Sequence, residues 1–328
     1  GMFTTDHLWF LKWISGNSES ILIPPPGETL FVPIVAPLVV MALTYLTNVL
    51  YKFILEQRDK HFLKDTFGTY IAPELIDKMY EEKQEPKLGG DAGVHTAFFT
   101  DIQSFSAFSE KLSAEEVVEL LNEYLTDMTD ILLEHKGTLD KYIGDAIVAF
   151  YGAPVPVENH EHMACLTAVN MQIGLDVLRK KWQSEGDRWP DIVHNMQNRI
   201  GIATGDMVTG NMGSAMRMNY TMMGDIVNTA ARLESSAKQY GVYIQVAEAT
   251  YLAAKDGFEW RQLDYAIVKG KNEPVYVFEL MSIKDNLPEG YAEMLDAYHK
   301  ALELYRSQKF EAALEAFTHS DTLEDMFP

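Results

Sequence analysis

An uncharged run near the start of the chain limits most strongly what the chain can fold into. The segment TLFVPIVAPLVVMALTYLTNVLY, from Thr29 to Tyr51, contains no charged residue. A transmembrane helix needs about 20 predominantly apolar residues, so this run is long enough to cross a bilayer. A helix buried in a protein core is the alternative, but the length of the run argues against it. We therefore predict a transmembrane helix over residues 29–53, preceded by a pre-membrane segment over residues 1–28.

The charges beside this run predict its orientation. Four basic residues follow it closely: Lys52, Arg58, Lys60 and Lys64. Because loops rich in Lys and Arg stay in the cytoplasm, we expect the rest of the chain to be cytoplasmic. The run begins close to the N-terminus, so we also expect that a sensor domain could precede Gly1 in the native protein.

The next segment, residues 54–90, is predicted to be a helical linker. Its apolar residues Ile54, Phe62 and Phe67 recur at helical spacing between charged ones. This pattern fits either a short parallel dimer helix or an amphipathic helix packed on its own domain. The polar stretch EEKQEPKLGGDAG then indicates a domain boundary.

Strands and helices alternate in the following domain, residues 91–282. A strand (HTAFFTDI), a helix capped by Ser113, and a hairpin that turns at Gly144 and Asp145 come first. A helix around residues 160–181 and the strand NRIGIATG come next. The order strand–helix–hairpin–helix–strand is typical of a ferredoxin-like α+β sheet, which is the fold class we predict. A strand pair (MVTGNMG and NYTMMGD), a helix (IVNTAARLESSAKQYG) and short strands complete the domain.

Two aspartates occupy places that this order brings together. Asp101 ends the first strand, in the stretch FFTDIQSF, and Asp145 lies in the hairpin turn. Alone, Asp101 would fit a helix N-cap and Asp145 a turn residue. Side by side, two carboxylates repel unless a cation lies between them, and Mg²⁺ or Mn²⁺ prefers oxygen ligands. We therefore predict a metal site, with the backbone N–H groups from Ile102 to Phe105 holding phosphate.

The overall charge argues against nucleic acid as a partner. The 328 residues carry a formal net charge of -21, whereas a surface that neutralises nucleic-acid phosphates needs clustered Lys and Arg. A small polyanion held by metals and a few cations is compatible with this charge. Cys165 is the only cysteine, so no intrachain disulfide can form, as in proteins of reducing compartments.

Four segments resemble the signature blocks of the class III nucleotidyl cyclases: FFTDIQSFSAFSE, LDKYIGDAIVAFYGAP, YTMMGDIVNTAARLE and VKGK. They occur in the family's order and spacing and cover about residues 95–281. The resemblance implies that Asp101 and Asp145, with the backbone of Ile102, bind two Mg²⁺ or Mn²⁺ ions. It also implies attack of a nucleotide's ribose 3′-OH on its α-phosphate, with release of pyrophosphate.

The resemblance assigns Lys141 and Thr221 to recognition of the base. Lys141 alternates with Leu139 and Ile143 in the sequence, where a lysine could also simply extend its charge to solvent. In the family, lysine with aspartate or threonine reads adenine, whereas guanylate cyclases typically carry glutamate and cysteine. Lysine can donate to adenine N1 and the threonine hydroxyl can accept from the exocyclic amine, so ATP is the expected substrate.

Three further residues match the family's ribose and phosphate contacts. Asn228 and Arg232 are four apart and so share one helix face. The resemblance makes Asn228 the residue that orients the ribose and Arg232 the one that stabilises charge on the transferred phosphoryl group. Lys269 matches the lysine that binds the triphosphate. Without the resemblance, Arg232 could pair with Glu234 or a neighbouring acid on the surface, and Lys269 could be a solvated hairpin charge.

The C-terminal segment, residues 288–328, is predicted to be a helical tail. AYHKALELYRSQKFEAALEAF has the spacing of one tetratricopeptide-like helix pair, with Ala301, Ala313 and Phe317 at the small and aromatic positions. A plain amphipathic helical hairpin fits equally well. We expect this tail either to pack on the domain before it or to begin a longer array.

These patterns lead to one prediction of function. We expect a bacterial adenylate cyclase, anchored in the inner membrane by one helix, that converts ATP to 3′,5′-cyclic AMP. One chain carries the complete set of site residues, so two identical chains could form two equivalent sites in a homodimer. The alternatives are a guanylate cyclase and a catalytically silent regulatory dimer. Silent relatives usually lose a metal aspartate or the Asn/Arg pair, and this sequence retains both.

Overall fold

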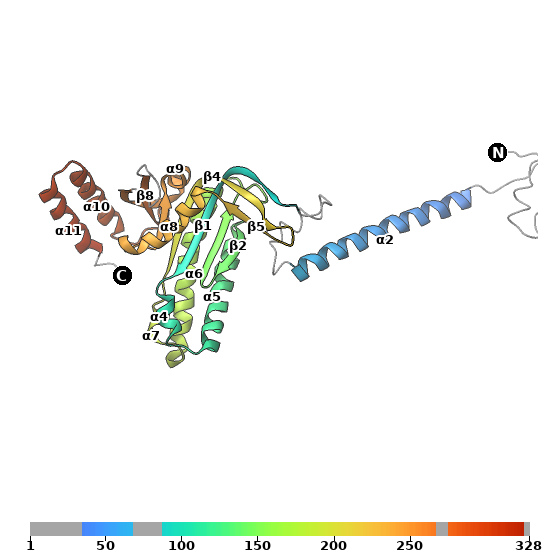
Figure 1. The fold of residues 1–328 in the computed structure, drawn as a ribbon, viewed down its shortest axis with the longest axis horizontal. Coiled ribbons are helices and arrows are strands. Elements are labelled where there is room, and N and C mark those ends of the chain that lie inside the picture. The colour runs from blue at the N-terminus through green and yellow to red at the C-terminus, as the bar shows by residue number, and fades with distance from the viewer. Residues whose placement is uncertain (1–34, 68–86, 267–274, 325–328) are drawn as a thin grey trace, which may run out of the picture. The chain divides into compact units, whose positions relative to one another are not determined.

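The computed structural model describes residues 35–67, 87–266 and 275–324. The chain divides into two compact units, residues 1–70 and residues 71–328, and each is described by itself (Figure 1). Lys269 and residues 29–34 of the predicted transmembrane helix lie outside the described residues.

The first unit contains one long helix, α2, which runs from Val35 to Phe67 without a break. It therefore joins most of the predicted transmembrane span to the beginning of the predicted helical linker. Within α2, the segment Leu38–Leu55 is long and apolar enough to cross a membrane. Pro37 lies in the first turn, where its missing N–H removes no helical hydrogen bond.

Polar side chains within this apolar segment bond back to the helix itself. The Thr44 hydroxyl donates to the carbonyl of Val40 at 2.8 Å, and the Asn48 amide donates to the carbonyl of Thr44 at 2.9 Å. Thr47 donates in the same way to the carbonyl of Leu43. Local bonds of this kind satisfy polar groups that an apolar environment would otherwise leave unpaired. The side chains of Thr44, Thr47 and Asn48 are thus compatible with a lipid environment.

The second unit is built on one mixed sheet. Its described strands are β1 Gly89–Ile102, β2 Thr138–Ile143, β3 Ala146–Tyr151, β4 Asn198–Ser214, β5 Arg217–Met223, β6 Ile244–Ala247, β7 Phe258–Ala266 and β8 Val275–Ile283. They follow the order β2-β3-β1-β4-β6-β8-β7, with β5 paired to β4 outside this path. β4 and β6 are parallel, and the other described pairs are antiparallel.

Helices cover both faces of this sheet (Figure 1). α5 (Ala114–Glu134) and α6 (His160–Ser184) share a core cluster with sheet residues that include Phe98 and Ile200. α8 (Asp225–Tyr240) packs on the opposite face, in a second cluster that includes Val148. The shorter described helices are α4 Phe105–Ser109, α7 Asp191–His194 and α9 Glu248–Ala254, with 3-10 turns at Gly186–Arg188 and Lys255–Gly257.

The ferredoxin-like order predicted from the sequence is confirmed. β1, α5, β2, β3, α6 and β4 follow one another as strand, helix, hairpin, helix and strand. Ser113 caps α5 in a reciprocal pair of bonds with Glu116, as the sequence indicated. Gly144 takes a φ of 65° in the β2–β3 turn, a left-handed conformation that glycine adopts without a steric penalty.

Three details of the strand prediction were wrong. β1 begins at Gly89, inside the stretch predicted as a polar boundary, because its first residues pair with β4 as far as Asn211. NRIGIATG and MVTGNMG form the single strand β4, although Gly205, which ends the first segment, and Asp206, which follows it, resemble a turn. Pairing with β1 along its whole length keeps this stretch extended, so tertiary context overrides local propensity. Strand β7 was not predicted.

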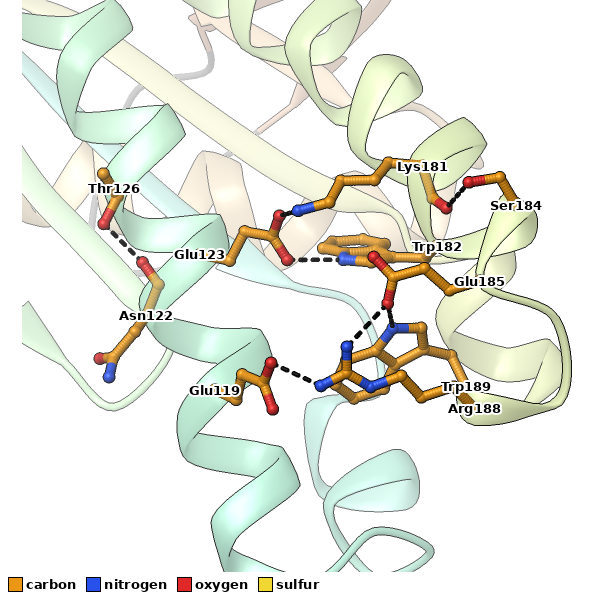
Figure 2. A network of polar contacts seen from close by, with 10 residues as sticks. All are labelled: Glu119, Asn122, Glu123, Thr126, Lys181, Trp182, Ser184, Glu185, Arg188 and Trp189. Atoms are coloured by element: carbon orange, nitrogen blue, oxygen red, sulfur yellow. Dashed lines mark hydrogen bonds and ion pairs between the residues drawn. The ribbon is translucent and has the colours of Figure 1, made fainter.

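A network of polar contacts ties α5 to α6 (Figure 2). Trp182 is fully buried, and its indole N–H donates to Glu123 at 2.9 Å. Lys181 pairs with the other oxygen of the same carboxylate. One turn further along, Arg188 bonds Glu119 at 2.5 Å. The carboxylates of α5 therefore satisfy the buried indole and hold the C-terminal end of α6 in place.

The helical tail packs on the domain before it, as one of the two sequence expectations stated. It consists of α10 (Tyr291–Arg306) and α11 (Phe310–Glu324). Arg261 of β7 donates to Glu324 at 2.8 Å and to Glu279 at 2.6 Å. The side chain of Arg261 is 8% exposed, so this bridge ties the end of α11 to the edge of the sheet from a largely buried position.

Candidate active site

Asp101 and Asp145 approach each other, as predicted from the strand order. Asp101 lies at the end of β1, and Asp145 lies in the turn between β2 and β3. The backbone N–H of Ile102 donates to Asp145 Oδ2 at 3.0 Å, which joins the end of β1 to the turn. The antiparallel pairing of β1 with β3 produces this meeting, because Thr100 lies opposite Ile147.

The two carboxylates disfavour each other's charge. Burial, and then the nearby charge of Asp101, raises the pKa of Asp145 to about 6. Asp145 is 9% exposed, whereas the Asp101 side chain is 35% exposed. Two carboxylates that lie close together repel each other, and a hard divalent cation prefers oxygen ligands. Such a cation would therefore stabilise the charged form of this pair. Among the described residues no group of three or more His, Cys, Asp or Glu surrounds such a position, so other oxygens would have to complete the coordination.

Arg199 of β4 joins this site, although the sequence analysis did not single it out. It lies directly opposite Asp101 in the β1–β4 pairing, and its Nη2 donates to Asp101 Oδ2 at 3.0 Å. Its Nε donates to Glu234 of α8 at 3.1 Å. The available signal was a charged residue within the otherwise apolar strand NRIGIATG. Glu234, one of the acids considered as a partner for Arg232, pairs with Arg199 in this structure.

The predicted phosphate cradle is only partly available. The N–H of Ile102 donates to Asp145, and the N–H of Gln103 donates to the carbonyl of Gln197 at 2.8 Å. Both amides therefore already have partners in this structure, and the prediction that the backbone N–H groups from Ile102 to Phe105 hold phosphate stays a prediction. α4 begins at Phe105 and is a single short turn of helix. The backbone of Ile102 as a metal ligand stays a prediction.

Lys141 and Thr221 lie side by side, although they are far apart in the sequence. Lys141 is on β2 and Thr221 on β5, and Lys141 Nζ donates to Thr221 Oγ1 at 3.3 Å. The pairing register of β2 shifts between Leu139, opposite Ala149, and Lys141, opposite Val148. Asp140 is thus the extra residue of a β-bulge.

This bulge corrects one part of the sequence analysis. The alternation predicted that Lys141 shares a face with Leu139, but the register shift places the two on opposite faces. Leu139 packs against the core beneath α5 and α6, whereas Val148, opposite Lys141, belongs to the other face. The bulge therefore directs Lys141 toward β5 and Thr221.

Asp140 completes a three-residue cluster with Lys141 and Thr221. The Thr221 hydroxyl donates to Asp140 Oδ2 at 2.5 Å, and Lys141 Nζ lies 3.3 Å from Asp140 Oδ1. The Asp140 side chain is 2% exposed, whereas that of Lys141 is 43% exposed. Burial raises the pKa of Asp140, while the bond from Thr221 and the charge of Lys141 act in the opposite direction.

Asn228 and Arg232 lie on α8, four residues apart as predicted. Asn228 is exposed to solvent. One terminal nitrogen of Arg232, Nη1, is buried and has no hydrogen-bond partner among the described residues. A buried donor without a partner is costly, so this nitrogen is suited to an external acceptor such as a phosphate. Lys269 lies outside the described residues, and its role stays a prediction.

Within the described part of one chain, no hydrogen bond connects the aspartate pair to Lys141, Thr221, Asn228 or Arg232. The predicted site residues of one chain thus lie in three places: the aspartates with Arg199, the cluster of Asp140, Lys141 and Thr221 on β2 and β5, and the helix α8.

Comparison with known proteins shows which family the chain resembles. Residues 92–281 match the family described as adenylate and guanylate cyclase catalytic domain. Adenylate cyclase 1 of Rhizobium meliloti (strain 1021) is 34% identical over 221 residues, which are 66% of this chain and 32% of that protein. The chain thus spans about a third of the length of this curated relative.

Solved structures of the same kind share the fold. The crystal structure of the adenylyl cyclase CyaB from P. aeruginosa matches with a TM-score of 0.55 and 33% identity, covering 61% of this chain and all of that one. The guanylyl cyclase Cya2 matches with a TM-score of 0.52 and 30% identity, covering 61% of this chain and 97% of that one. With the family match over residues 92–281 and the aspartate pair at the end of β1, this chain belongs to the adenylate and guanylate cyclase catalytic domain family.

Proposed function

We propose that this chain is an adenylate cyclase, which converts ATP to 3′,5′-cyclic AMP and pyrophosphate. The observation that carries the choice of ATP is the contact between Lys141 and Thr221. A lysine donor suits adenine N1, and a hydroxyl that can accept suits the exocyclic amine. Guanine presents the opposite polarity at both positions, and mispaired polar groups can lower use of the wrong substrate by about 10⁴. The similarity to named adenylate cyclases supports the same choice.

The carboxylates of Asp101 and Asp145 fit two Mg²⁺ or Mn²⁺ ions. They are oxygen ligands, they lie close enough for Asp101 to raise the pKa of Asp145, and the backbone of Ile102 is adjacent. When bound, such ions neutralise the triphosphate and lower the pKa of the ribose 3′-OH. In this proposal, Arg199 keeps Asp101 in position through the bond to its Oδ2.

The remaining site residues bind and orient the nucleotide. Asn228 orients the ribose, and Arg232 stabilises the negative charge that develops on the transferred phosphoryl group. Removal of such an arginine can reduce the rate by about 10³ to 10⁵. The unpaired Nη1 of Arg232 supports this role, because an external acceptor would satisfy it. Lys269 binds the triphosphate.

The chain acts as a homodimer in this proposal. The aspartates of one chain and the groups on β2, β5 and α8 of the other would form each site across a two-fold axis. Within the described part of one chain no hydrogen bond joins these groups directly, which is compatible with this arrangement.

The helix α2 anchors the enzyme in the inner membrane, with the catalytic domain in the cytoplasm. The apolar length of Leu38–Leu55 supports the anchor, and the basic residues Lys52 and Arg58 support the orientation. A sensor domain before the described chain would supply the signal.

One assay tests this function. The full chain is incubated with ATP or GTP and with Mg²⁺ or Mn²⁺, and the cyclic products are separated and quantified. Cyclic AMP formation at a clearly higher kcat/KM than cyclic GTP formation is the expected result. A preference for GTP would make the chain a guanylate cyclase, and the absence of both products would favour a silent regulatory domain.

A further inference from the structure

The cluster on β2 and β5 contains one residue without an assigned role. Asp140 is almost completely buried, with its side chain 2% exposed, yet it lies between two residues that are expected to touch the base. It is the extra residue of the β-bulge in β2. A bulge lets two successive side chains point toward one face, and here both Asp140 and Lys141 reach Thr221.

The hydrogen-bond polarity of Thr221 is determined by this neighbour. A threonine hydroxyl has one proton and two lone pairs, so it can either donate to a ligand or accept from one. Its proton is directed to Asp140 Oδ2, at 2.5 Å. One lone pair accepts a hydrogen bond from Lys141 Nζ, at 3.3 Å. What the hydroxyl can still offer to a base is therefore a lone pair.

We propose that Asp140 is a specificity-determining positioning residue, which makes Thr221 an obligate hydrogen-bond acceptor and thereby selects the 6-amino group of adenine over the 6-oxo group of guanine. Adenine presents an amine donor at this position, and guanine presents an acceptor. A threonine without Asp140 could turn its proton toward guanine O6. With Asp140, the Thr221 hydroxyl has the polarity that an aspartate would have at position 221.

This inference rests on the proposed adenylate cyclase activity and adds a residue to it. The charge of Lys141, 3.3 Å from Asp140 Oδ1, keeps the buried carboxylate in its acceptor form. Lys141 also discriminates directly, because guanine carries a proton at N1. We therefore expect the loss of Asp140 to weaken selectivity and not to reverse it.

The test uses the full chain and measures kcat/KM for ATP and for GTP separately. Asp140→Asn preserves shape but can offer an N–H to Thr221 Oγ1, which frees the hydroxyl proton to turn outward. The ratio of ATP to GTP use should fall by about tenfold to a hundredfold, with GTP use rising in absolute terms. An equal loss for both nucleotides, or an unchanged ratio, overturns the proposal.

A second pair of variants distinguishes this role from a structural one. Thr221→Asp in the presence of Asp140 places two carboxylates together and should lower ATP use. Adding Asp140→Asn to Thr221→Asp should raise ATP use again, because the amide then donates to the new carboxylate. The same change thus impairs the chain that retains Thr221 and improves the chain that carries Thr221→Asp. If Asp140→Asn impairs both backgrounds, the carboxylate has only a structural role and the proposal fails.

Nucleotide selectivity can still be measured if one variant is inactive. Displacement of a fluorescent ATP analogue by ATP and by GTP reports selectivity without turnover, and thermal unfolding reports whether each variant is folded. If the Asp140→Asn single variant does not fold, the comparison of Thr221→Asp with and without Asp140→Asn still tests the proposal. A wild-type chain that prefers GTP in the assay contradicts the proposed function itself. A wild-type chain that prefers ATP, with Asp140→Asn unchanged in preference, contradicts only the inference about Asp140.

Discussion

Arg199 holds Asp101 with one nitrogen and Glu234 with another: Nη2 to Asp101 Oδ2 is 3.0 Å, and Nε to Glu234 Oε1 is 3.1 Å. The guanidinium is 12% exposed and the Glu234 side chain 11% exposed. Burial raises the pKa of Glu234, which the contact with Arg199 counteracts. Asp101, a ligand in the proposed metal site, is therefore tied to α8, the helix that carries Asn228 and Arg232.

Removal of Arg199 should destabilise the domain. Arg199→Ala leaves two carboxylates without their shared partner, and breaking a buried pair in this way costs about 3–5 kcal/mol in the free energy of unfolding. Urea unfolding at neutral pH measures this loss of stability. The loss should shrink as pH falls, because burial raises the pKa of Glu234 and its protonation removes the unpaired buried charge. Arg188→Ala, at a site 46% exposed, is the matched control and should lose about 1 kcal/mol or less. Equal losses at the two sites would contradict this account.

The bond between Trp182 and Glu123 predicts a pH-dependent stability (Figure 2). Bonds from Lys181 and Trp182 lower the pKa of Glu123, against the effect of burial. A carboxyl group whose pKa is lower in the folded state stabilises the fold above its unfolded pKa and loses this contribution as pH falls. Glu123→Gln should therefore lower the free energy of unfolding at pH 7 by about 1–2 kcal/mol. The difference from wild type should shrink as the pH falls below about 4.5.

The control for this prediction is Glu119→Gln on the same helix. Like Glu123, Glu119 pairs with a basic side chain, in this case Arg188. The Glu119 side chain is 55% exposed, however, and it accepts no hydrogen bond from a buried indole. Its substitution should change stability by less than about 1 kcal/mol. A Glu123→Gln chain as stable as the Glu119→Gln chain across this pH range would show that the indole bond contributes nothing.

The aspartate pair leads to a prediction about activity and metal. Asp101→Ala and Asp145→Asn should each reduce cyclase activity to a few per cent or less, since each removes a charged oxygen ligand. Asn at position 145 can still accept from the N–H of Ile102, so the fold should persist. Circular dichroism checks the fold, and Mn²⁺ titration by calorimetry checks binding. Substantial activity in either variant with Mg²⁺ would refute the role of the pair.

Some of this site could be predicted from the sequence because strand order alone determines it. Asp101 and Asp145 meet because antiparallel pairing of β1 with the β2–β3 hairpin leaves no other arrangement. The shared face of Asn228 and Arg232 on α8 followed from helical spacing, because residues four apart in a helix lie on the same side.

Other features depend on single-residue events that no period reveals. The bulge at Asp140 reverses the face of every residue after it in β2, so alternation placed Lys141 on the wrong side. The donors of Ile102 and Gln103 are taken by Asp145 and by a carbonyl distant in sequence, which only the folded chain shows. Arg199 contacts Asp101 because the two residues lie opposite each other in the β1–β4 pairing. Such cross-strand partners depend on the strand register, which the periodicity of a single strand does not reveal.

The proposed role of Lys141 and Thr221 in reading the base predicts that substitutions there change the preferred nucleotide. Lys141→Glu with Thr221→Cys should weaken ATP use and admit GTP, since both polarities then suit guanine. The buried carboxylate of Asp140 would face the new glutamate, so adding Asp140→Asn should improve GTP use further. Measured kcat/KM values for ATP and GTP report both effects. If the triple variant used GTP no better than the double variant, Asp140 would not oppose a carboxylate at position 141.

The last prediction concerns the proposed homodimer. If each site combines the aspartates of one chain with α8 of the other, Asp101→Ala and Arg232→Ala homodimers should both be nearly inactive. In a mixed dimer, one site then carries both lesions and the other carries neither.

Such mixed dimers should recover activity, approaching about half the wild-type rate per dimer if the two sites act independently. Exchange between preformed dimers can be slow where helices pair, so both chains should be co-expressed with different tags and purified through both. Two chains that both carry Asp101→Ala, tagged and purified in the same way, give the background. Verified mixed dimers that remain at this background would mean that the catalytic residues act within one chain. In that case Arg199, which ties Asp101 to α8 through Glu234, would connect the aspartate pair to Arg232 of the same chain and would be the residue to substitute next.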